Sequence, residues 1–244
     1  MTGRLMTGKK RAAIGCLVAG AMAVAGPAWA EETARDPFEG FNRGMFAVNE
    51  GLDTVVFRPV AQAYDFAVPL PAKAGVGSFF GNIADFRNAL NNTLQGKLAD
   101  AGSDLGRLLI NSTVGIFGLF DVASELGLEK HDEDFGQTLA VWGWGHSSFV
   151  FWPILGPRTV RDTGGWVVDA YSDPTWYTLN KSVAARNSLV ALRFVDVRAS
   201  LLPSDKVVEE AALDKYAYVR DAYLQRRRSQ IFDGRPPRLD DVLD

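Results

Sequence analysis

The chain has 244 residues, of which 47% are hydrophobic, and it carries 26 basic against 29 acidic side chains. Four of the basic residues and no acidic one lie in the first thirty residues, so the rest of the chain has 22 basic residues and a net charge of −7. This balance argues against a nucleic-acid partner, and the length fits one domain with a substantial core or one that also exposes apolar surface to lipid.

Residues 1–30 have the pattern of a signal peptide. Lys9, Lys10 and Arg11 precede an apolar run from Ala12 to Pro27, and Ala28-Trp29-Ala30 fits a cleavage site. The run is shorter than the roughly 20 residues of a spanning helix. We therefore expect export, with a mature chain that begins at Glu31; a retained N-terminal anchor is the alternative.

The only cysteine is Cys16, which follows three small or apolar residues as in an acylated lipoprotein. It lies too close to the basic cluster, because the apolar region of a signal peptide usually has about 7–15 residues. We prefer cleavage after Ala30, which puts a lipid anchor in doubt. The mature chain would then lack a disulfide, a thiolate nucleophile and a cysteine-ligated metal site.

The mature chain opens with a predicted amphipathic helix. Asp36 fits the N-cap, Pro37 the first helical position, and Glu39 is placed to reach back to the cap. Its apolar residues recur at spacings of three and four. They are Phe38, Phe41, Met45, Val48, Leu52 and Val55. The helix is expected to end before Pro59 and to need a partner surface.

After an extended segment, Val68–Pro71, a second helical pattern runs from Val76 to Leu94. Gly75, Gly77 and Gly81 predict the close approach of another helix, a kink or a later start. Its other face is rich in amides, which is typical of solvated surface, although it could line a wet channel. The residues of this face are Asn82, Asp85, Asn88, Asn92 and Gln95.

Three later segments are also amphipathic. Gly106–Phe120 is too short and too polar to span a membrane, so it is either a buried helix and loop or an interfacial segment. Asn180–Val197 predicts a helix. A last stripe leads into Arg226–Arg228, where cations suit a helix C-terminus; a headgroup or partner contact is the alternative. That stripe consists of Leu213, Tyr216, Val219 and Tyr223.

The aromatic stretch Asp134–Gly165 predicts an irregular or hairpin-like segment. Its tryptophans and phenylalanines alternate with glycines and precede Arg158 and Arg161. Tryptophan favours the headgroup level of a membrane and arginine pairs with phosphate, so the composition suits a membrane interface. Taken alone, however, a tryptophan-rich run more often packs in a core than contacts lipid.

Enzyme signatures are missing: the chain has no G-x-S-x-G, H-E-x-x-H or P-loop motif. His131 heads an acidic run to Asp134, which is typical of a solvated loop, with a cation site as the minor alternative. His146 precedes Ser147 and Ser148, a weak signal for a nucleophile. We expect no enzyme activity, no metal and no cofactor.

Several motifs occur together along the mature chain. They are Asp36-Pro37-Phe38-Glu39-Gly40-Phe41-Asn42-Arg43, Arg58-Pro59-Val60-Ala61, Leu94-Gln95-Gly96, Asn111-Ser112-Thr113-Val114-Gly115, Asp134-Phe135-Gly136-Gln137-Thr138-Leu139, Leu155-Gly156-Pro157 and Arg161-Asp162. In this order they resemble the MlaA family, also called VacJ. The resemblance implies a mainly α fold over residues 31–233, followed by a polar tail, 234–244.

The resemblance further implies a membrane-embedded ring of helices with a central amphipathic pore, in the inner leaflet of the outer membrane. Such a protein removes mislocalised phospholipids from the outer leaflet and passes them to a soluble periplasmic carrier. Family members associate with trimeric porins and perform no reaction on the lipid. A soluble periplasmic lipid-binding or adaptor protein is the alternative, followed by a lipid hydrolase that uses Ser147 or Ser148.

Residue chemistry places the expected lipid path in the aromatic stretch, with an apolar rim and phosphate-binding arginines. Its residues are Trp142, Trp144, Phe149, Trp152, Arg158 and Arg161. The two most specific family motifs supply a second set of candidate residues. These are Asp36, Pro37, Glu39, Gly40, Phe41, Asn42, Arg43, Asp134, Phe135, Gly136 and Gln137.

Overall fold

The structure, a computed structural model, describes residues 36–237 and is mainly helical, as predicted. The expected signal peptide, Cys16 and the end of the polar tail lie outside the described residues, so the predictions about them stay predictions. The elements are α2 (Glu39–Leu52), a π-helical turn (Asp53–Phe57), α3 (Arg58–Ala67), α4 (Leu70–Leu94), α5 (Leu98–Thr113), α6 (Val122–Glu125), α7 (Phe135–Val141), β1 (Phe149–Trp152), β2 (Gly156–Thr159), α8 (Val160–Ser172), α9 (Pro174–Thr178), α10 (Val183–Ala211) and α11 (Lys215–Ile231).

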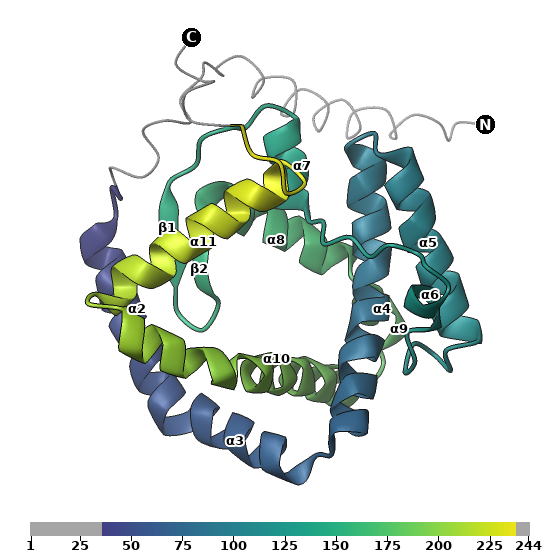
Figure 1. Cartoon of the computed structure of the whole chain (residues 1–244), viewed down its shortest axis with the longest axis horizontal. Helices are drawn as coiled ribbons and strands as arrows, with labels where there is room; N and C mark the ends of the chain where they lie inside the picture. Colours follow the sequence, from purple (N-terminus) through teal and green to yellow (C-terminus); the bar gives the residue numbers. More distant parts are fainter. Residues whose placement is uncertain (1–35, 238–244) are drawn as a thin grey trace, which may run out of the picture.

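The helices are arranged as a ring (Figure 1). Helices α4 and α5 pack side by side on one side of the ring, and α3 packs along α10 on a second side. Helix α2 closes the third side, where it contacts β1. Within the described part of the chain, no helix is both long enough and apolar enough to cross a bilayer.

Helix α2 begins two residues later than predicted, at Glu39 rather than Pro37. Asp36 still caps this end, because its Oδ1 accepts a hydrogen bond from Phe38 N and its carbonyl oxygen accepts one from Glu39 N. Glu39 does not reach back; it pairs instead with Arg43, at 2.8 Å, one turn along the helix.

The predicted helix end before Pro59 is wrong. The chain passes through the π-helical turn directly into α3, and Arg58 N donates to Asp53 O in the wider π pattern. Proline lacks an N–H and crowds the preceding turn of a regular helix. The widened turn just before Pro59 makes room for the ring, so the helical course continues to Ala67.

Helix α4 starts at Leu70, earlier than its apolar pattern predicted, with Pro71 in the first turn, where the missing N–H costs nothing. Its glycines accommodate a loop and a side chain rather than another helix. A Cβ atom at Gly75 would lie 3.6 Å from Leu119 O, and one at Gly81 would lie 2.5 Å from Lys130 Nζ.

The predicted hairpin is confirmed: β1 pairs antiparallel with β2, with Phe149 opposite Thr159. Phe149 and Phe151 pack against Tyr216 of α11 in a buried apolar cluster, together with Phe46 of α2. The last helix begins at Lys215, so Leu213 lies before it and is fully exposed, contrary to the predicted stripe.

Candidate functional site

The distribution of side chains is inverted relative to an ordinary soluble domain. Among the described residues, eighteen polar or charged side chains are buried, against eleven apolar ones, six of which are alanine. Large apolar side chains instead cover the outside, and Phe66 at the end of α3 is 94% exposed. Exposed apolar surface on this scale marks contact with an apolar medium or a partner.

The amide-rich face of α4, predicted as solvated surface, is buried against α5 and the segment that follows α6. Asn92 Nδ2 donates to Asp104 at 2.8 Å, and Asn88 Oδ1 accepts from Glu133 N at 3.1 Å. The prediction failed because it assumed that water lies outside and apolar packing inside. Helical periodicity identifies two faces but not which of them meets the interior.

Arg107 of α5 is the centre of this polar interior, and its side chain is fully buried. Its Nη2 binds both carboxylate oxygens of Asp121 at 2.9 Å, and its Nε lies 3.3 Å from Asp85. A buried charge is tolerated when it is paired in this way. Burial raises the pKa of Asp121, but hydrogen bonds from Ser124, Asn111 and Arg107 outweigh this effect and lower the pKa to about 2.

The loop after α5 exposes several large apolar side chains, which the interfacial alternative for Gly106–Phe120 requires. Val114, Ile116, Phe117 and Phe120 are all exposed in a succession of turns. Ile116 and Phe117 have φ angles of 51° and 55°, a region that branched and bulky residues rarely occupy. The loop is therefore held in a strained conformation that presents apolar side chains outward.

The second family motif forms a buried ion-pair network between α7, α8 and α11. Arg227 donates to both carboxylate oxygens of Asp134 at 2.6 Å and to Asp162 Oδ1 at 2.7 Å, while Tyr223 OH donates to Asp162 Oδ2 at 2.7 Å. Arg227 thus acts through ion pairs rather than through the helix dipole expected for the triplet. Asp134 also caps α7 by accepting from Gln137 N at 2.9 Å.

The first family motif fixes the hairpin to α2. Asn42, fully buried, donates from Nδ2 to Phe149 O at 3.2 Å and to Asp36 Oδ1 at 2.9 Å, and its Oδ1 accepts from Phe151 N at 2.8 Å. Tyr216 OH donates to Asp36 Oδ2. Two helical turns on, Asn49 repeats the arrangement with Trp152 O and Ile154 N.

The other residues of the first motif lie on the outside of α2. Arg43 pairs with Asp214 at 2.7 Å and lies 4.6 Å from the centre of the Tyr216 ring. Phe41 is exposed, and nothing lies within 4 Å of the position that a Cβ atom would take at Gly40. The motif therefore combines structural contacts with exposed surface.

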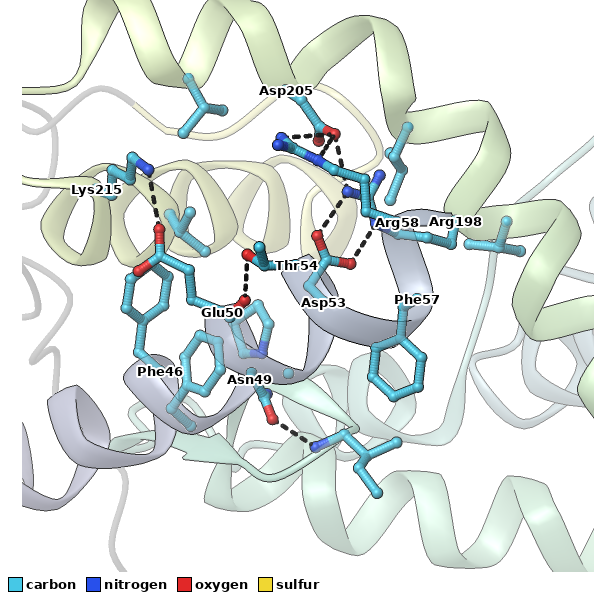
Figure 2. Close-up of a pocket in the computed structure, with 18 of the residues that line it drawn as sticks. Phe46, Asn49, Glu50, Asp53, Thr54, Phe57, Arg58, Arg198, Asp205 and Lys215 are labelled. Atoms are coloured by element: carbon cyan, nitrogen blue, oxygen red, sulfur yellow. Dashed lines mark hydrogen bonds and ion pairs between the residues drawn. The ribbon is translucent and has the colours of Figure 1, made fainter. Parts of the chain in front are cut away.

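A cavity of about 440 Å³ lies between α2, the π-helical turn, the hairpin, α10 and α11 (Figure 2). Its walls are partly apolar, and a set of charged residues crosses it. The apolar lining includes Phe46, Phe57, Phe151, Phe194, Val197 and Leu201. We call the charged set the charged rim: Glu50, Asp53, Arg58, Arg198, Asp205, Glu209 and Lys215.

Ion pairs of the charged rim connect α10 and α11 to α2, the π-helical turn and α3. Arg198 binds Asp53 at 2.6 and 2.7 Å and Asp205 at 2.8 Å, and Arg58 binds Asp205 at 3.1 Å. Glu209 accepts from Arg58 at 2.8 Å. The hydrogen bonds to Asp53 raise the pKa of Arg198, so its charge is fixed.

One residue of the charged rim, Asp53, lies in the π-helical turn. A π turn contains an extra residue, which rotates the following helix relative to the preceding one. Asp53, Thr54 and Phe57 lie in this turn and all line the cavity. Since π turns occur frequently at functional sites, this placement supports the cavity as the candidate site.

The structure does not bring the six residues of the expected lipid path together on one surface. Phe149 is in the apolar cluster, and Arg161 is buried, where it donates to Trp144 O at 2.9 Å and Gly145 O at 2.6 Å. Trp142 and Trp144 are exposed. None of the six lines the cavity, although their neighbours Phe151, Ile154, Gly156 and Pro157 do.

The remaining two residues of that set lie at the hairpin and α8. Trp152 Nε1 donates to Thr163 Oγ1 at 2.9 Å. The Arg158 guanidinium lies 5.4 Å from the centre of the Trp166 ring, and burial lowers its pKa. No ion pair to Arg158 occurs within residues 36–237.

Sequence reasoning missed the cavity-lining face of α10. Its residues recur at helical spacing, from Phe194 to Glu209, but the predicted helix stopped at Val197. Pro203 interrupts the pattern within α10. If the helical spacing of apolar residues had been followed past Pro203, it would have indicated this face of α10.

The two histidine motifs that gave weak signals for catalysis or cation binding contain residues that make structural contacts. Ser147 Oγ accepts a hydrogen bond from Arg161 N at 2.8 Å, and in the described part of the chain no hydrogen bond joins His146 to either neighbouring serine. His131 Nδ1 lies 3.0 Å from Asp104 Oδ1. Residues 36–237 contain no group of three potential ligands that could hold a metal ion.

The ring buries polar side chains, exposes large apolar ones and encloses an amphipathic cavity. This arrangement is typical of a class of proteins that contact an apolar medium or a partner. Residues 34–230 match the family described as MlaA lipoprotein. The chain belongs to the MlaA family, as the sequence motifs predicted.

Relatives from several bacteria support the assignment. The intermembrane phospholipid transport system lipoprotein MlaA of Escherichia coli K12 is 36% identical over 196 residues, which cover 78% of this chain and 76% of the relative. The protein of the same name from Haemophilus influenzae is 30% identical over 205 residues, 82% of this chain and 80% of the relative. An uncharacterized protein of Rickettsia bellii is 36% identical over 197 residues, 80% and 76% of the two chains.

A solved structure also resembles the chain. It is described as a structural basis for maintenance of bacterial outer membrane lipid asymmetry, and it matches with a TM-score of 0.69 at 33% sequence identity. The match covers 82% of this chain and all of the solved chain. The fold described above is therefore that of an experimentally known relative.

Proposed function

We propose that this chain is the outer-membrane component of an intermembrane phospholipid transport system. It takes mislocalised phospholipids from the outer leaflet and passes them through the ring to a soluble periplasmic carrier, which maintains lipid asymmetry. The chain is exported and lies in the inner leaflet, at the periplasmic face of the outer membrane. It acts as a conduit and performs no chemical step on the lipid.

The observation that carries this proposal is the inverted distribution of side chains. Apolar residues of α2, the π-helical turn and α3, such as Phe41, Val55 and Phe66, are exposed, while Arg107 and the amides of α4 are buried. A helix that lies in a membrane interface buries its apolar face among acyl chains. Backbone groups in such a medium must be satisfied internally, and a ring of helices does this.

The amphipathic cavity supports a passage for lipid. Its volume of about 440 Å³ falls within the range of roughly 300–1,000 Å³ typical of ligand sites. Phe57, Phe194 and Leu201 offer apolar contacts to acyl chains, and the charged rim offers contacts to a headgroup. Trp142, Trp144 and Arg158 remain proposed contacts at the membrane boundary rather than in the cavity.

Partners follow from the same surface. We propose that part of the exposed apolar outside contacts a trimeric porin, since many large apolar side chains are exposed there and exposed apolar patches mark interaction sites. The family relationship supports the porin and the periplasmic carrier as partners. A soluble periplasmic adaptor, the alternative, would leave the apolar outside in water.

The test is a lipid-asymmetry assay in a deletion strain of the source bacterium that lacks a redundant homologue. Outer-leaflet phospholipid is measured with an amine-reactive reagent that does not cross the membrane. Deletion should increase the labelled phospholipid, and the wild-type chain should reverse this increase. Unchanged labelling on deletion would overturn the transport proposal.

Two variants of α10 locate the passage. Val197 lines the cavity, so Val197→Trp should fill it and fail to restore asymmetry. Val207 is exposed on the same helix and does not line the cavity, so Val207→Trp should restore asymmetry as the wild type does. Equal amounts of both variants in the membrane fraction are required. Full restoration by Val197→Trp would exclude this cavity as the passage.

A further inference from the structure

We propose that the cavity selects zwitterionic phospholipids with an ammonium-bearing headgroup over phospholipids with an anionic headgroup. This inference rests on the proposed function and concerns the substrate class of the same cavity. It comes from the charge, the burial and the order of the residues in the charged rim.

The charged rim has more carboxylates than cations. Four acidic residues and three basic ones line the cavity, so its net charge is −1. An anionic headgroup would enter a site of its own sign, whereas a zwitterionic headgroup brings no net charge. The carboxylate in excess is a direct partner for an ammonium group.

Burial within the rim places cations and carboxylates at different depths. The Arg198 side chain is 13% exposed and its main partner Asp53 is 29% exposed, whereas Glu50 and Glu209 are 46% and 47% exposed. The innermost cation is therefore Arg198, and the outermost carboxylates are Glu50 and Glu209. Lys215, at 42%, lies at the outer level beside Glu50.

This order corresponds to the order of groups in such a lipid. Acyl chains would contact the apolar wall, the phosphate would meet Arg198 at the inner level, and the ammonium would meet the outer glutamates. Arg198 is suited to the phosphate because its Nη1 is buried and makes no hydrogen bond, while Nε and Nη2 hold the two aspartates. A guanidinium with an unused donor can bind a further oxygen.

The outer glutamates also have capacity for an ammonium. Each uses one carboxylate oxygen in its ion pair: Glu50 Oε1 accepts from Lys215 at 2.9 Å and Glu209 Oε1 accepts from Arg58 at 2.8 Å. The other oxygen of each carboxylate makes no hydrogen bond within the charged rim. An ionised carboxylate has about four acceptor positions, so a second cation can be accommodated.

The test is a competition between phosphatidylethanolamine and phosphatidylglycerol with identical acyl chains. The full-length chain, purified in detergent, is incubated with an equimolar mixture of the two lipids, and native mass spectrometry counts the bound molecules of each. We expect phosphatidylethanolamine to be retained at least about threefold over phosphatidylglycerol, the effect of one or two partly exposed ion pairs. An equal ratio, or an excess of phosphatidylglycerol, would overturn the inference and leave the transport proposal intact.

Two variants test whether the charged rim is responsible for the choice of headgroup. Glu50→Gln together with Glu209→Gln should bring the ratio close to one without loss of total bound lipid. Asp65→Asn, which removes a carboxylate from the exposed Asp65–Lys73 ion pair outside the cavity, should leave the ratio unchanged. A ratio that persists in the double variant, with an unchanged unfolding temperature, would show that these glutamates do not select the headgroup.

A third variant and the total binding distinguish the two proposals. Arg198→Lys should reduce retention of both lipids by about the same factor, because both carry the phosphate that Arg198 contacts. Retention of neither lipid by the wild-type chain would count against lipid binding in this cavity, and so against the proposed function itself. A change in the ratio caused by Arg198→Lys would contradict the assignment of the phosphate to this residue.

Discussion

Arg227 of α11 and Asp134, the cap of α7, form a bidentate ion pair in the interior, with both nitrogen–oxygen distances at 2.6 Å. The residues are far apart in the sequence, so the pair joins the end of the last helix to the start of a family motif. Asp162 of α8 completes the contact at 2.7 Å. Three helices are therefore fixed at one point by charge rather than by apolar packing.

Removal of this arginine should destabilise the fold strongly. Arg227→Ala leaves Asp134 without an ion-pair partner and Asp162 with only Arg161, at 3.4 Å, and the loss of one partner of a buried ion pair costs about 3–5 kcal/mol. Chemical denaturation of the purified chain measures the free energy of unfolding. The control is Arg226→Ala, because Arg226 is 74% exposed and lies 3.5 Å from Asp132, so its loss should cost less than about 1 kcal/mol. Equal costs for both variants would contradict the assigned role.

Two adjacent glycines of α8 should respond in opposite directions to the same substitution. A Cβ atom at Gly165 would lie 2.3 Å from Gly136 N, so Gly165→Ala would force α7 and α8 apart and should cost about 1–3 kcal/mol. At Gly164 nothing lies within 4 Å of this position, so Gly164→Ala should stabilise the helix by roughly 0.5–1 kcal/mol. Thermal unfolding of both variants checks this. Similar unfolding temperatures would mean that the close approach does not exist.

Much of the fold could be predicted because helical and hairpin signals are local. The apolar stripe that ends in Leu94 and the stripe through Tyr216 and Tyr223 each depend on nearby residues, as does the hairpin-like pattern of the aromatic stretch. Boundaries failed where an unusual local geometry intervened, as at Pro59, since no sequence pattern announces a π-helical turn. Phe149 was expected at a lipid boundary but lies in a core, and the amides of α4 were expected at the surface but lie inside. Both predictions failed because a sequence pattern does not specify whether a face meets water, lipid or the protein interior.

The cavity could not be predicted from local patterns. Arg198 and Asp53 lie 2.6 Å apart but are separated by 145 positions in the chain, and only the closed ring brings them together. Before the structure, Arg58 was recognised as a motif residue without a role. The sequence thus identified the family and its structural motifs but not the residues that line the cavity.

Asn42 should be essential for the position of the hairpin. Asn42→Ala removes a donor to Phe149 O and an acceptor from Phe151 N, and leaves both buried backbone groups without these partners. Each unsatisfied group costs about 1–3 kcal/mol, so the free energy of unfolding should fall by at least about 2 kcal/mol. Asn187 is exposed on α10, and Asn187→Ala should have little effect. Faster amide hydrogen exchange in β1 of the Asn42→Ala variant alone would confirm the contact.

Asp121 should make stability depend on pH in the acid range. Burial raises its pKa, but hydrogen bonds from Ser124, Asn111 and Arg107 lower it to about 2, below the value of about 3.9 in an unfolded chain. This contribution is therefore complete above about pH 4 and is lost as the pH falls toward 2. Because the carboxylate is 30% exposed, we expect it to be worth about 1 kcal/mol.

The measurement compares wild type with Asp121→Asn in denaturant titrations between pH 6 and pH 2.5. Asp85 and Glu133, whose pKa values burial raises, act in the opposite direction. The contribution of Glu133 cancels in the difference, whereas Asp121 adds to the raised pKa of Asp85, so part of the Asp85 contribution remains in the wild type alone. The wild type should be the more stable at pH 6, and the gap should narrow by about 1 kcal/mol toward pH 2.5. A gap that stays constant over this range would mean that the hydrogen bonds from Ser124, Asn111 and Arg107 do not lower the pKa of the Asp121 carboxylate.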